Sequence, residues 1–208
     1  MVTRKSILLL AGGFFTALAL VGIGVGAMMY YTNRVVAELE QSFPFDNTKE
    51  ILRSGAELQK AKTAYERWIA LGDAGMWAVE AGALDSAKTY AEELLQDSGK
   101  YPKDWNYGNA IHKGNLILGR VALRQGNRAE AARHLLTAGR TPGSPQLNSF
   151  GPNMTLAKEL LEVGERDIVL QYVDLCRTFW LMDLGNTGAW EKIIDSGRIP
   201  NFGPHLVY

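Results

Sequence analysis

The stretch LGRVALRQGNRAEAARHLLTAGRTP, residues 118–142, contains one complete helix–turn–helix unit. Small and apolar residues recur at helical spacing in both halves, and they predict two faces that pack together: Leu118, Gly119 and Ala122, then Ala131, Leu135 and Ala138. Gly126-Asn127 interrupts the pattern, and Pro142 cannot continue the second helix. The stretch therefore predicts two antiparallel helices that approach closely where Gly119 and Ala131 remove side-chain bulk.

The same unit recurs on both sides of this stretch. A shift of 44 residues toward the N-terminus leads from Gly119, Ala122, Gly126 and Ala131 to four identical residues: Gly75, Ala78, Gly82 and Ala87. A shift of 38 residues toward the C-terminus gives a fainter copy: Ala157, Leu160, Gly164, Val169 and Val173. We therefore expect about three helical hairpins, which cover roughly residues 71–179.

The spacing resembles that of the tetratricopeptide repeat (TPR), whose pattern is W-x2-L-G-x2-Y, then A-x3-F, then Pro. The chain matches it with Asn115-x2-Leu118-Gly119-x2-Ala122, then Ala131-x3-Leu135, then Pro142, so the leading Trp and the two aromatic positions are replaced. The resemblance implies an all-α, TPR-like α-solenoid with capping helices over residues 48–197. An ordinary helical bundle, which shares Ala and Leu patterning, is the alternative.

In TPR proteins the first helix of each repeat lines a concave groove that holds a peptide or a neighbouring subunit. By this resemblance the groove here carries apolar and basic side chains: Met76, Val79, Lys113, Leu116, Arg120, Leu123, Arg124, Lys158 and Leu161. The basic bias favours an acidic segment or a chain terminus as the ligand. Alternatively, the Arg and Lys side chains only solvate the groove.

Residues 7–31 contain no charged side chain. As a helix that rises about 1.5 Å per residue, they span more than the roughly 30 Å hydrocarbon layer of a bilayer, which predicts a transmembrane helix. Arg4 and Lys5 precede it, so the positive-inside rule places residues 1–6 in the cytoplasm and the rest of the chain across the membrane, in the periplasm of a Gram-negative source. The alternative is a signal peptide cleaved near Ala27.

Gly22 and Gly26 form a GxxxG face within this segment. Such a face lets a second membrane helix approach closely, which predicts a helix partner in the bilayer. Glycine is also common in membrane helices that have no such partner, so both interpretations stay open.

Composition argues against several classes of function. Residues 1–31 hold two of the 22 basic side chains and none of the 22 acidic ones, so the remainder has a net charge of about −2 and is a poor nucleic-acid binder. The single Cys176 cannot form an internal disulfide and is expected in the core. His112, His134 and His205 have no partners at metal-ligand spacing, and no phosphate loop, GxSxG, HExxH or CxxC motif occurs. We expect no cofactor, no metal and no catalysis.

The remaining segments connect or cap the repeats. Residues 32–47 form a spacer, and residues 48–71 are expected to cover or merge into the first repeat. An aromatic connection with Tyr101, Trp105 and Tyr107 either contacts a peptide or folds onto the helices. Residues 141–153 are expected to form an ordered loop pinned to the core by Leu147 and Phe150, and residues 198–208 an extended tail.

Two functions follow from this organisation. The first is a membrane-anchored scaffold or chaperone-like accessory that binds proteins in its groove on the non-cytoplasmic side. The second is a permanent, non-catalytic subunit of a large membrane complex, held by both the GxxxG face and the helical repeats.

Overall fold

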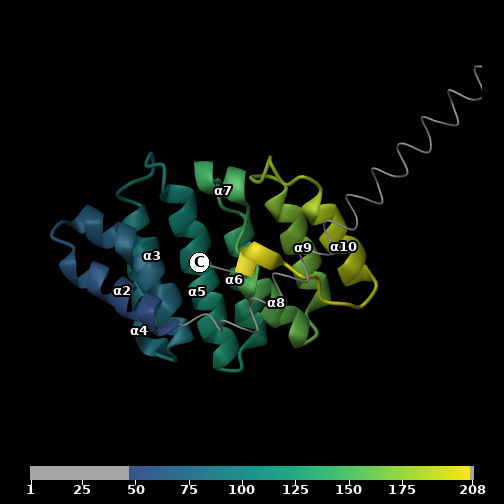
Figure 1. Cartoon of the computed structure of the whole chain (residues 1–208), viewed down its shortest axis with the longest axis horizontal. Helices are drawn as coiled ribbons and strands as arrows, with labels where there is room; N and C mark the ends of the chain where they lie inside the picture. Colours follow the sequence, from purple (N-terminus) through teal and green to yellow (C-terminus); the bar gives the residue numbers. More distant parts are fainter. Residues whose placement is uncertain (1–46, 207–208) are drawn as a thin grey trace, which may run out of the picture. The chain divides into compact units, whose positions relative to one another are not determined.

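A computed structural model describes residues 47–206, and in this range the chain forms helices and no strand. In order they are α2 (Asn47–Lys60), α3 (Ala64–Glu80), α4 (Leu84–Ser98), α5 (Tyr107–Arg124), α6 (Arg128–Gly139), α7 (Pro145–Phe150), α8 (Thr155–Glu162), α9 (Arg166–Cys176), α10 (Asn186–Asp195) and the short 3₁₀ helix η1 (Gly203–Leu206) (Figure 1). The predicted all-α class is confirmed for this part of the chain.

The three hairpins α3–α4, α5–α6 and α8–α9 turn in the same way. Each turn contains a glycine in the left-handed region: φ is 73° at Gly82, 81° at Gly126 and 90° at Gly164. In each, the N–H after the glycine donates at 2.9 Å to the carbonyl four residues before the glycine: Ala83 to Ala78, Asn127 to Ala122 and Glu165 to Leu160. The shifts of 44 and 38 residues therefore align structurally equivalent positions.

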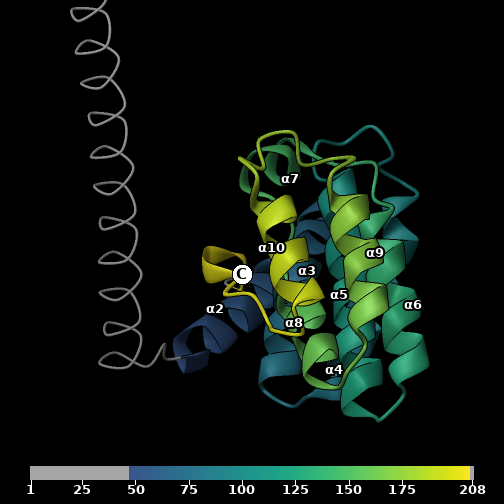
Figure 2. The ribbon, with the colours of Figure 1, turned by 90° about the vertical axis from the view of Figure 1, so that its right-hand side faces the viewer.

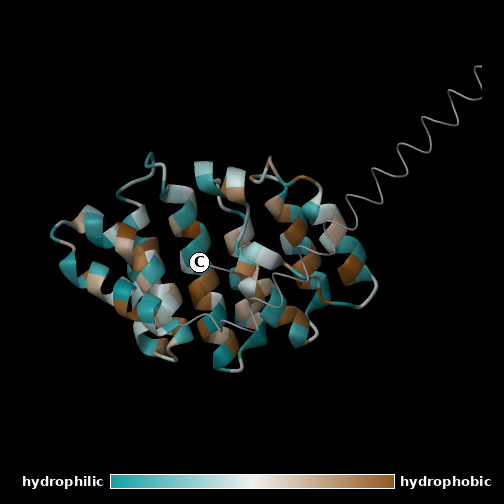
Figure 3. Cartoon of the chain, in the orientation of Figure 1, coloured by the Kyte–Doolittle hydropathy of each residue, from teal (hydrophilic) through white to brown (hydrophobic). Residues whose placement is uncertain are grey.

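The hairpins pack side by side in chain order. α2 lies against α3, α4 against α5, and α6 against both α8 and α9, while α10 covers α9 (Figures 1 and 2). Each helix carries an apolar and a hydrophilic side, so the apolar sides meet between helices (Figure 3). Equivalent repeat positions of the second helices are fully buried: Ala87, Ala131 and Val169, then Ala91, Leu135 and Val173.

The glycine that recurs in the first helix of the first two hairpins, Gly75 and Gly119, lies where successive hairpins meet. A Cβ on Gly119 would overlap Leu156 of the next hairpin and would lie 3.3 Å from the carbonyl oxygen of Ala131. A Cβ on Gly75 would lie 2.7 Å from Cδ1 of Ile117. The predicted approach of Gly119 to Ala131 is therefore confirmed, but the tightest neighbour belongs to α8 and not to the same hairpin.

Residues 48–71, predicted to cover or merge into the first repeat, do both: they contain nearly all of α2 and the first part of α3. Thr63 is the N-cap of α3, and its hydroxyl accepts a hydrogen bond from the N–H of Glu66 at 3.1 Å. The Glu66 carboxylate accepts in return from the N–H of Thr63 at 3.1 Å. This capping box fixes the start of α3, so α2 lies on the first hairpin as a separate cap.

The C-terminal tail folds back on the domain and is not extended throughout. After α10 the chain returns toward the middle of the helical array and forms η1 (Figure 1). Phe202 is 1% exposed and meets Trp190 edge-on, with ring centroids 5.1 Å apart. The N–H of Met154 donates to the carbonyl of His205 at 2.8 Å, so the tail is attached to the start of α8.

The predicted membrane span at residues 7–31, with Gly22 and Gly26, lies outside the described residues, as does the spacer up to residue 46. Within residues 47–206, no helix combines the length and the apolar composition that crossing a membrane requires. Asn47, the last residue assigned to the spacer, begins α2.

Candidate functional site

Three adjoining cavities lie along α3 and α5, the first helices of two successive hairpins. The outer cavity, about 560 Å³, lies between α2 and α3; the central cavity, about 240 Å³, lies between α3 and α5; the terminal cavity, about 290 Å³, lies between α5, α7 and η1. Ile69 and Asp73 line both the outer and the central cavity. Asn109, Lys113 and Gln146 line both the central and the terminal one. The three cavities therefore lie in a row and share walls, and we call this row the groove.

Amide side chains are held in place at the junction of the central and terminal cavities. The Asn109 Nδ2 donates to Oε1 of Gln146 at 3.2 Å and to Oδ1 of Asn106 at 2.9 Å. The Asn109 Oδ1 accepts from the hydroxyl of Ser144 at 2.6 Å, and that hydroxyl also caps α7 by accepting from the N–H of Leu147 at 3.0 Å. Because Gln146 accepts through its oxygen, its amide nitrogen stays available as a donor at the wall of both cavities.

The one cation that lines this junction is paired. Lys113 of α5 forms an ion pair with Asp73 of α3, and the two side chains are 36% and 45% exposed. Both residues line the central cavity. Their charges cancel at close range, so this part of the groove offers polar hydrogen-bonding groups without a strong net charge.

The floor of the terminal cavity is uncharged. His112 is fully buried, and its Nδ1 lies 3.1 Å from the carbonyl oxygen of Ala138, which can only accept, so Nδ1 carries the proton. Burial lowers the pKa of His112 to about 4; the Ala138 hydrogen bond opposes this shift, and the charge of Lys113 adds to it. The imidazole is therefore neutral at physiological pH, and the fully buried Met76 also borders this cavity.

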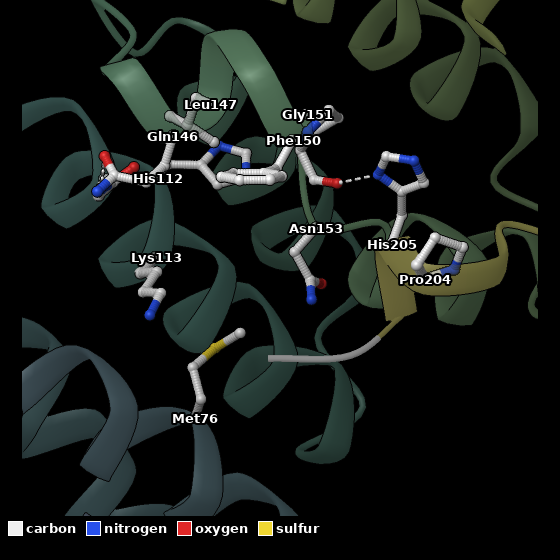
Figure 4. A pocket seen from close by; sticks show the side chains of 12 residues that line it. Met76, His112, Lys113, Gln146, Leu147, Phe150, Gly151, Asn153, Pro204 and His205 are labelled. Carbon is white, nitrogen blue, oxygen red and sulfur yellow. Dashed lines mark hydrogen bonds between the residues drawn. The ribbon is translucent and has the colours of Figure 1, made fainter. Parts of the chain in front are cut away.

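The rim of the terminal cavity comes from segments far apart in the sequence. Phe150 at the end of α7 is 77% exposed, and Pro204 and His205 of η1 lie across from it (Figure 4). His205 is held by its Nδ1, which donates to the carbonyl of Pro152 at 3.1 Å (Figure 4). The folded tail is thus one wall of the groove.

Of the residues predicted to line a groove, two do so. Met76 lines the terminal cavity, and Lys113 lines the terminal and central cavities. Met76 and Leu116 are fully buried and Val79 is 1% exposed, so none of these three side chains offers surface to a ligand. The remaining predicted residues line none of the three cavities: Arg120, Leu123, Arg124, Lys158 and Leu161.

The predicted basic surface is neutralised by carboxylates. Arg120 is 2% exposed and lies between Glu80 and Glu159, at 2.7 Å and 2.6 Å. Arg124 also binds Glu159, at 2.8 Å, and Lys158 lies 3.7 Å from Glu162. Each of these cations therefore has a carboxylate one hairpin or one helical turn away, which sequence spacing did not reveal, and the preference for an acidic ligand loses this support.

The groove contains residues that the sequence pattern did not single out, above all Asn109, Gln146 and His205. They lie on a helix start, a short helix within a connection and the folded tail, none of which belongs to the repeat. Leu147 is buried as predicted, whereas Phe150 is exposed and not pinned to the core. Tyr101 folds onto Trp68, with ring centroids 4.7 Å apart, while Trp105 stays half exposed at the central cavity.

Within residues 47–206, no group of three or more His, Cys, Asp or Glu side chains is arranged to hold a metal ion. Cys176 is fully buried, as predicted for a core residue, and burial raises the pKa of its thiol. The groove therefore offers apolar walls, fixed amides and a compensated ion pair, which suit hydrogen bonding to a neutral, extended ligand.

Comparison of the chain with protein-family models, curated proteins and solved structures gives no match.

Proposed function

We propose that this chain is a membrane-anchored, TPR-like scaffold whose groove binds a segment of another protein. The observation that carries the proposal is the row of three cavities that share lining residues. They follow α3 and α5, which are the first helices of their hairpins, and in TPR proteins the first helices line the binding groove. The repeated turn geometry at Gly82, Gly126 and Gly164 supports the TPR-like assignment.

The ligand that fits this groove best is an extended, largely uncharged polypeptide segment. Its backbone supplies donors and acceptors for groups such as the amide of Gln146 and the pair of Lys113 with Asp73. Its apolar side chains can enter the terminal cavity beside Pro204 and the ring of His205. Binding of this kind requires no catalytic group, so the proposed role is non-catalytic.

Anchoring is proposed from the uncharged residues 7–31, with the helical domain on the non-cytoplasmic side. A reporter enzyme fused after Tyr208 and active only outside the cytoplasm tests this orientation. Activity inside the cytoplasm would reverse it, and the size of the fusion on a blot distinguishes a retained span from a segment cleaved at Ala27.

The groove is tested by a matched pair of charge reversals in the full chain. Lys113→Glu places a second carboxylate beside Asp73 inside the groove, whereas Lys158→Glu makes the same change on α8 beside Glu162, outside all three cavities. Each full chain is purified in mild detergent, and co-purifying proteins are quantified by mass spectrometry. We expect partner retention to fall with Lys113→Glu and to be unchanged with Lys158→Glu.

The same measurement separates the scaffold from a permanent subunit. A scaffold retains varied proteins in sub-stoichiometric amounts, whereas a permanent subunit retains one fixed complex at constant ratio. If Gly22→Ile with Gly26→Ile abolishes retention and Lys113→Glu does not, the membrane segment and not the groove binds the partner.

A further inference from the structure

The exposed apolar side chains of the domain gather at one edge. Eight large apolar residues are exposed in the described range, and five of them belong to the α4–α5 connection, the end of α7 or the α9–α10 connection. Both ribbon views show these three segments at the same edge of the helical array (Figures 1 and 2). We call this set the loop edge: Trp105, Phe150, Leu181, Met182 and Leu184, which are 51%, 77%, 79%, 57% and 94% exposed.

The opposite edge has a different character. It is formed by the three glycine turns of the hairpins, at residues 81–83, 125–127 and 163–165. None of the exposed large apolar residues of the described range lies in these turns. The loop edge is therefore a local feature of one end of the domain, and general surface composition does not account for it.

The apolar side chains of the loop edge are held in place by the backbone beneath them. The N–H of Leu181 donates to Oδ1 of Asn148 at 3.1 Å, and the N–H of Met182 donates to the backbone carbonyl of Asn148 at 3.3 Å. Leu184 has φ 52°, a left-handed conformation that favours glycine over leucine. A leucine at this position gains little from the core, since it is almost fully exposed, so it is better suited to contact something outside the domain.

Two exposed cations lie among the apolar side chains of the loop edge. Lys103 and Arg140 are exposed there and form no ion pair within the described part of the chain. Of the nearby carboxylates, Asp97 pairs with Lys100, whereas Asp104 and Asp183 accept hydrogen bonds from neutral groups, the Tyr65 hydroxyl and the N–H of Gly185, and keep their charge. Two free cations thus flank exposed aromatic and aliphatic side chains.

We propose that the loop edge rests on the surface of a lipid bilayer, with Lys103 and Arg140 on headgroup phosphates. Tryptophan and phenylalanine favour the interface between headgroups and acyl chains, leucine and methionine insert shallowly, and lysine and arginine bind lipid phosphates. The inference rests on the proposed membrane anchoring, which keeps the domain near the bilayer, so that a weak surface contact is sufficient. The contact fixes which way the groove faces.

The test uses the fluorescence of Trp105 in the full chain. Trp68, Trp77, Trp180 and Trp190 are at most 5% exposed, so Trp105 is the tryptophan that reports on contact with the surroundings. The chain is combined with vesicles of phosphatidylcholine and phosphatidylglycerol in which the phosphatidylcholine acyl chains carry bromine, a quencher inside the bilayer. We expect brominated lipid to remove roughly half of the Trp105 emission, measured as the difference from Trp105→Phe, and aqueous iodide to quench it less than without vesicles.

Matched variants assign the effect to the loop edge. Leu181→Asp with Leu184→Asp should abolish the bromine quenching, whereas Leu52→Asp, on the exposed surface of α2, should leave it unchanged. Lys103→Glu with Arg140→Glu should reduce quenching. Because all substituted side chains are exposed, the fold is expected to be retained, which circular dichroism checks.

Trp105 emission that is insensitive to brominated lipid and fully open to iodide would overturn the inference, and so would quenching that persists in the Leu181→Asp, Leu184→Asp variant. If the loop edge instead docks on a protein, Trp105 emission is also insensitive to brominated lipid in protein-free vesicles. If the chain still stays in the membrane fraction after a carbonate wash, the proposed anchoring holds and only the surface contact fails. Loss of both would reject the anchoring as well.

Discussion

Arg120 and Glu159 connect the second hairpin to the third through a buried ion pair. The Nη2 of Arg120 lies 2.6 Å from Oε1 of Glu159, and its Nε lies 3.0 Å from Oε2, so the contact is bidentate. The Nη1 of the same guanidinium binds Glu80 of the first hairpin at 2.7 Å. One buried side chain therefore fixes three consecutive hairpins relative to one another.

This arrangement predicts a large effect for Arg120→Ala. The substitution leaves Glu159 and Glu80 facing each other without their shared cation, and removing one partner of a buried pair costs about 3–5 kcal/mol. We expect a loss of this size in the free energy of unfolding of residues 47–208, measured by urea denaturation. Arg124→Ala is the control, because Arg124 binds the same carboxylate but is 47% exposed, and it should cost at most about 1 kcal/mol. Equal losses of unfolding free energy in the two variants would contradict the role of Arg120 in connecting the hairpins.

Gly119→Ala should destabilise the domain although it adds only a methyl group. That group would overlap Leu156 and lie 3.2 Å from Cβ of His134, and overpacking of this kind costs about 1–3 kcal/mol. Gly55→Ala in α2 is the matched control, since no atom lies within 4 Å of its added Cβ. There the helix propensity of alanine should raise stability by up to about 1 kcal/mol. Thermal melting of both variants checks the opposite signs, and a stabilised Gly119→Ala would mean that the hairpins are not in close contact at this glycine.

The repeat positions could be predicted from the sequence because local chemistry determines them. Gly82, Gly126 and Gly164 each provide the positive φ that ends the first helix of a hairpin, and the buried second-helix positions recur at fixed spacing from them. Local patterns of this kind fix helix number and turn geometry before any tertiary contact is known. The all-α class followed directly from them.

The groove could be predicted only in part because distant contacts create it. Arg120 looks like a groove cation in the sequence, yet Glu80 and Glu159, 40 and 39 residues away, bury and neutralise it. Gln146 and His205 reach the site through α7 and the folded tail, whose positions no repeat pattern specifies. Met76 and Lys113 lie on the helices α3 and α5 beside the cavities, but so do Leu116 and Arg120 on α5, which helix packing buries.

The low pKa of the buried His112 predicts that the domain loses stability in mild acid. Its pKa in the folded chain is about 4, mainly through burial, against an ordinary value of 6.5. Below pH 6.5 the unfolded chain therefore binds a proton that the folded chain does not, and the free energy of unfolding falls as the pH decreases toward 4, by up to about 3 kcal/mol. His134 and His205 also have lowered pKa values, mainly through burial, and they contribute in the same direction.

The share of His112 is isolated by His112→Gln, a side chain that still fits hydrogen bonding to Ala138 but does not titrate. Urea denaturation of residues 47–208 at pH values between 6.5 and 4 should give a shallower pH dependence for this variant than for the unchanged chain. Parallel pH profiles would show that His112 is already protonated, or exposed to solvent, in the folded domain.

The buried ring of Phe202 holds the folded tail, which forms one wall of the groove. Its ring is buried against Trp190, and three residues later the carbonyl of His205 accepts from the N–H of Met154. Phe202→Ala removes the apolar contact that holds the tail, and large-to-alanine substitutions at buried aromatic positions cost about 3–5 kcal/mol. The tail should then detach before the helices unfold, since only this short segment depends on the ring.

Hydrogen exchange at the Met154 amide should accelerate strongly, because its acceptor leaves with the tail. Ile199→Ala, in the same tail but 42% exposed, should leave this exchange rate nearly unchanged. If Met154 stays protected in Phe202→Ala, another contact holds η1 in place, and the tail remains a wall of the groove without its aromatic anchor.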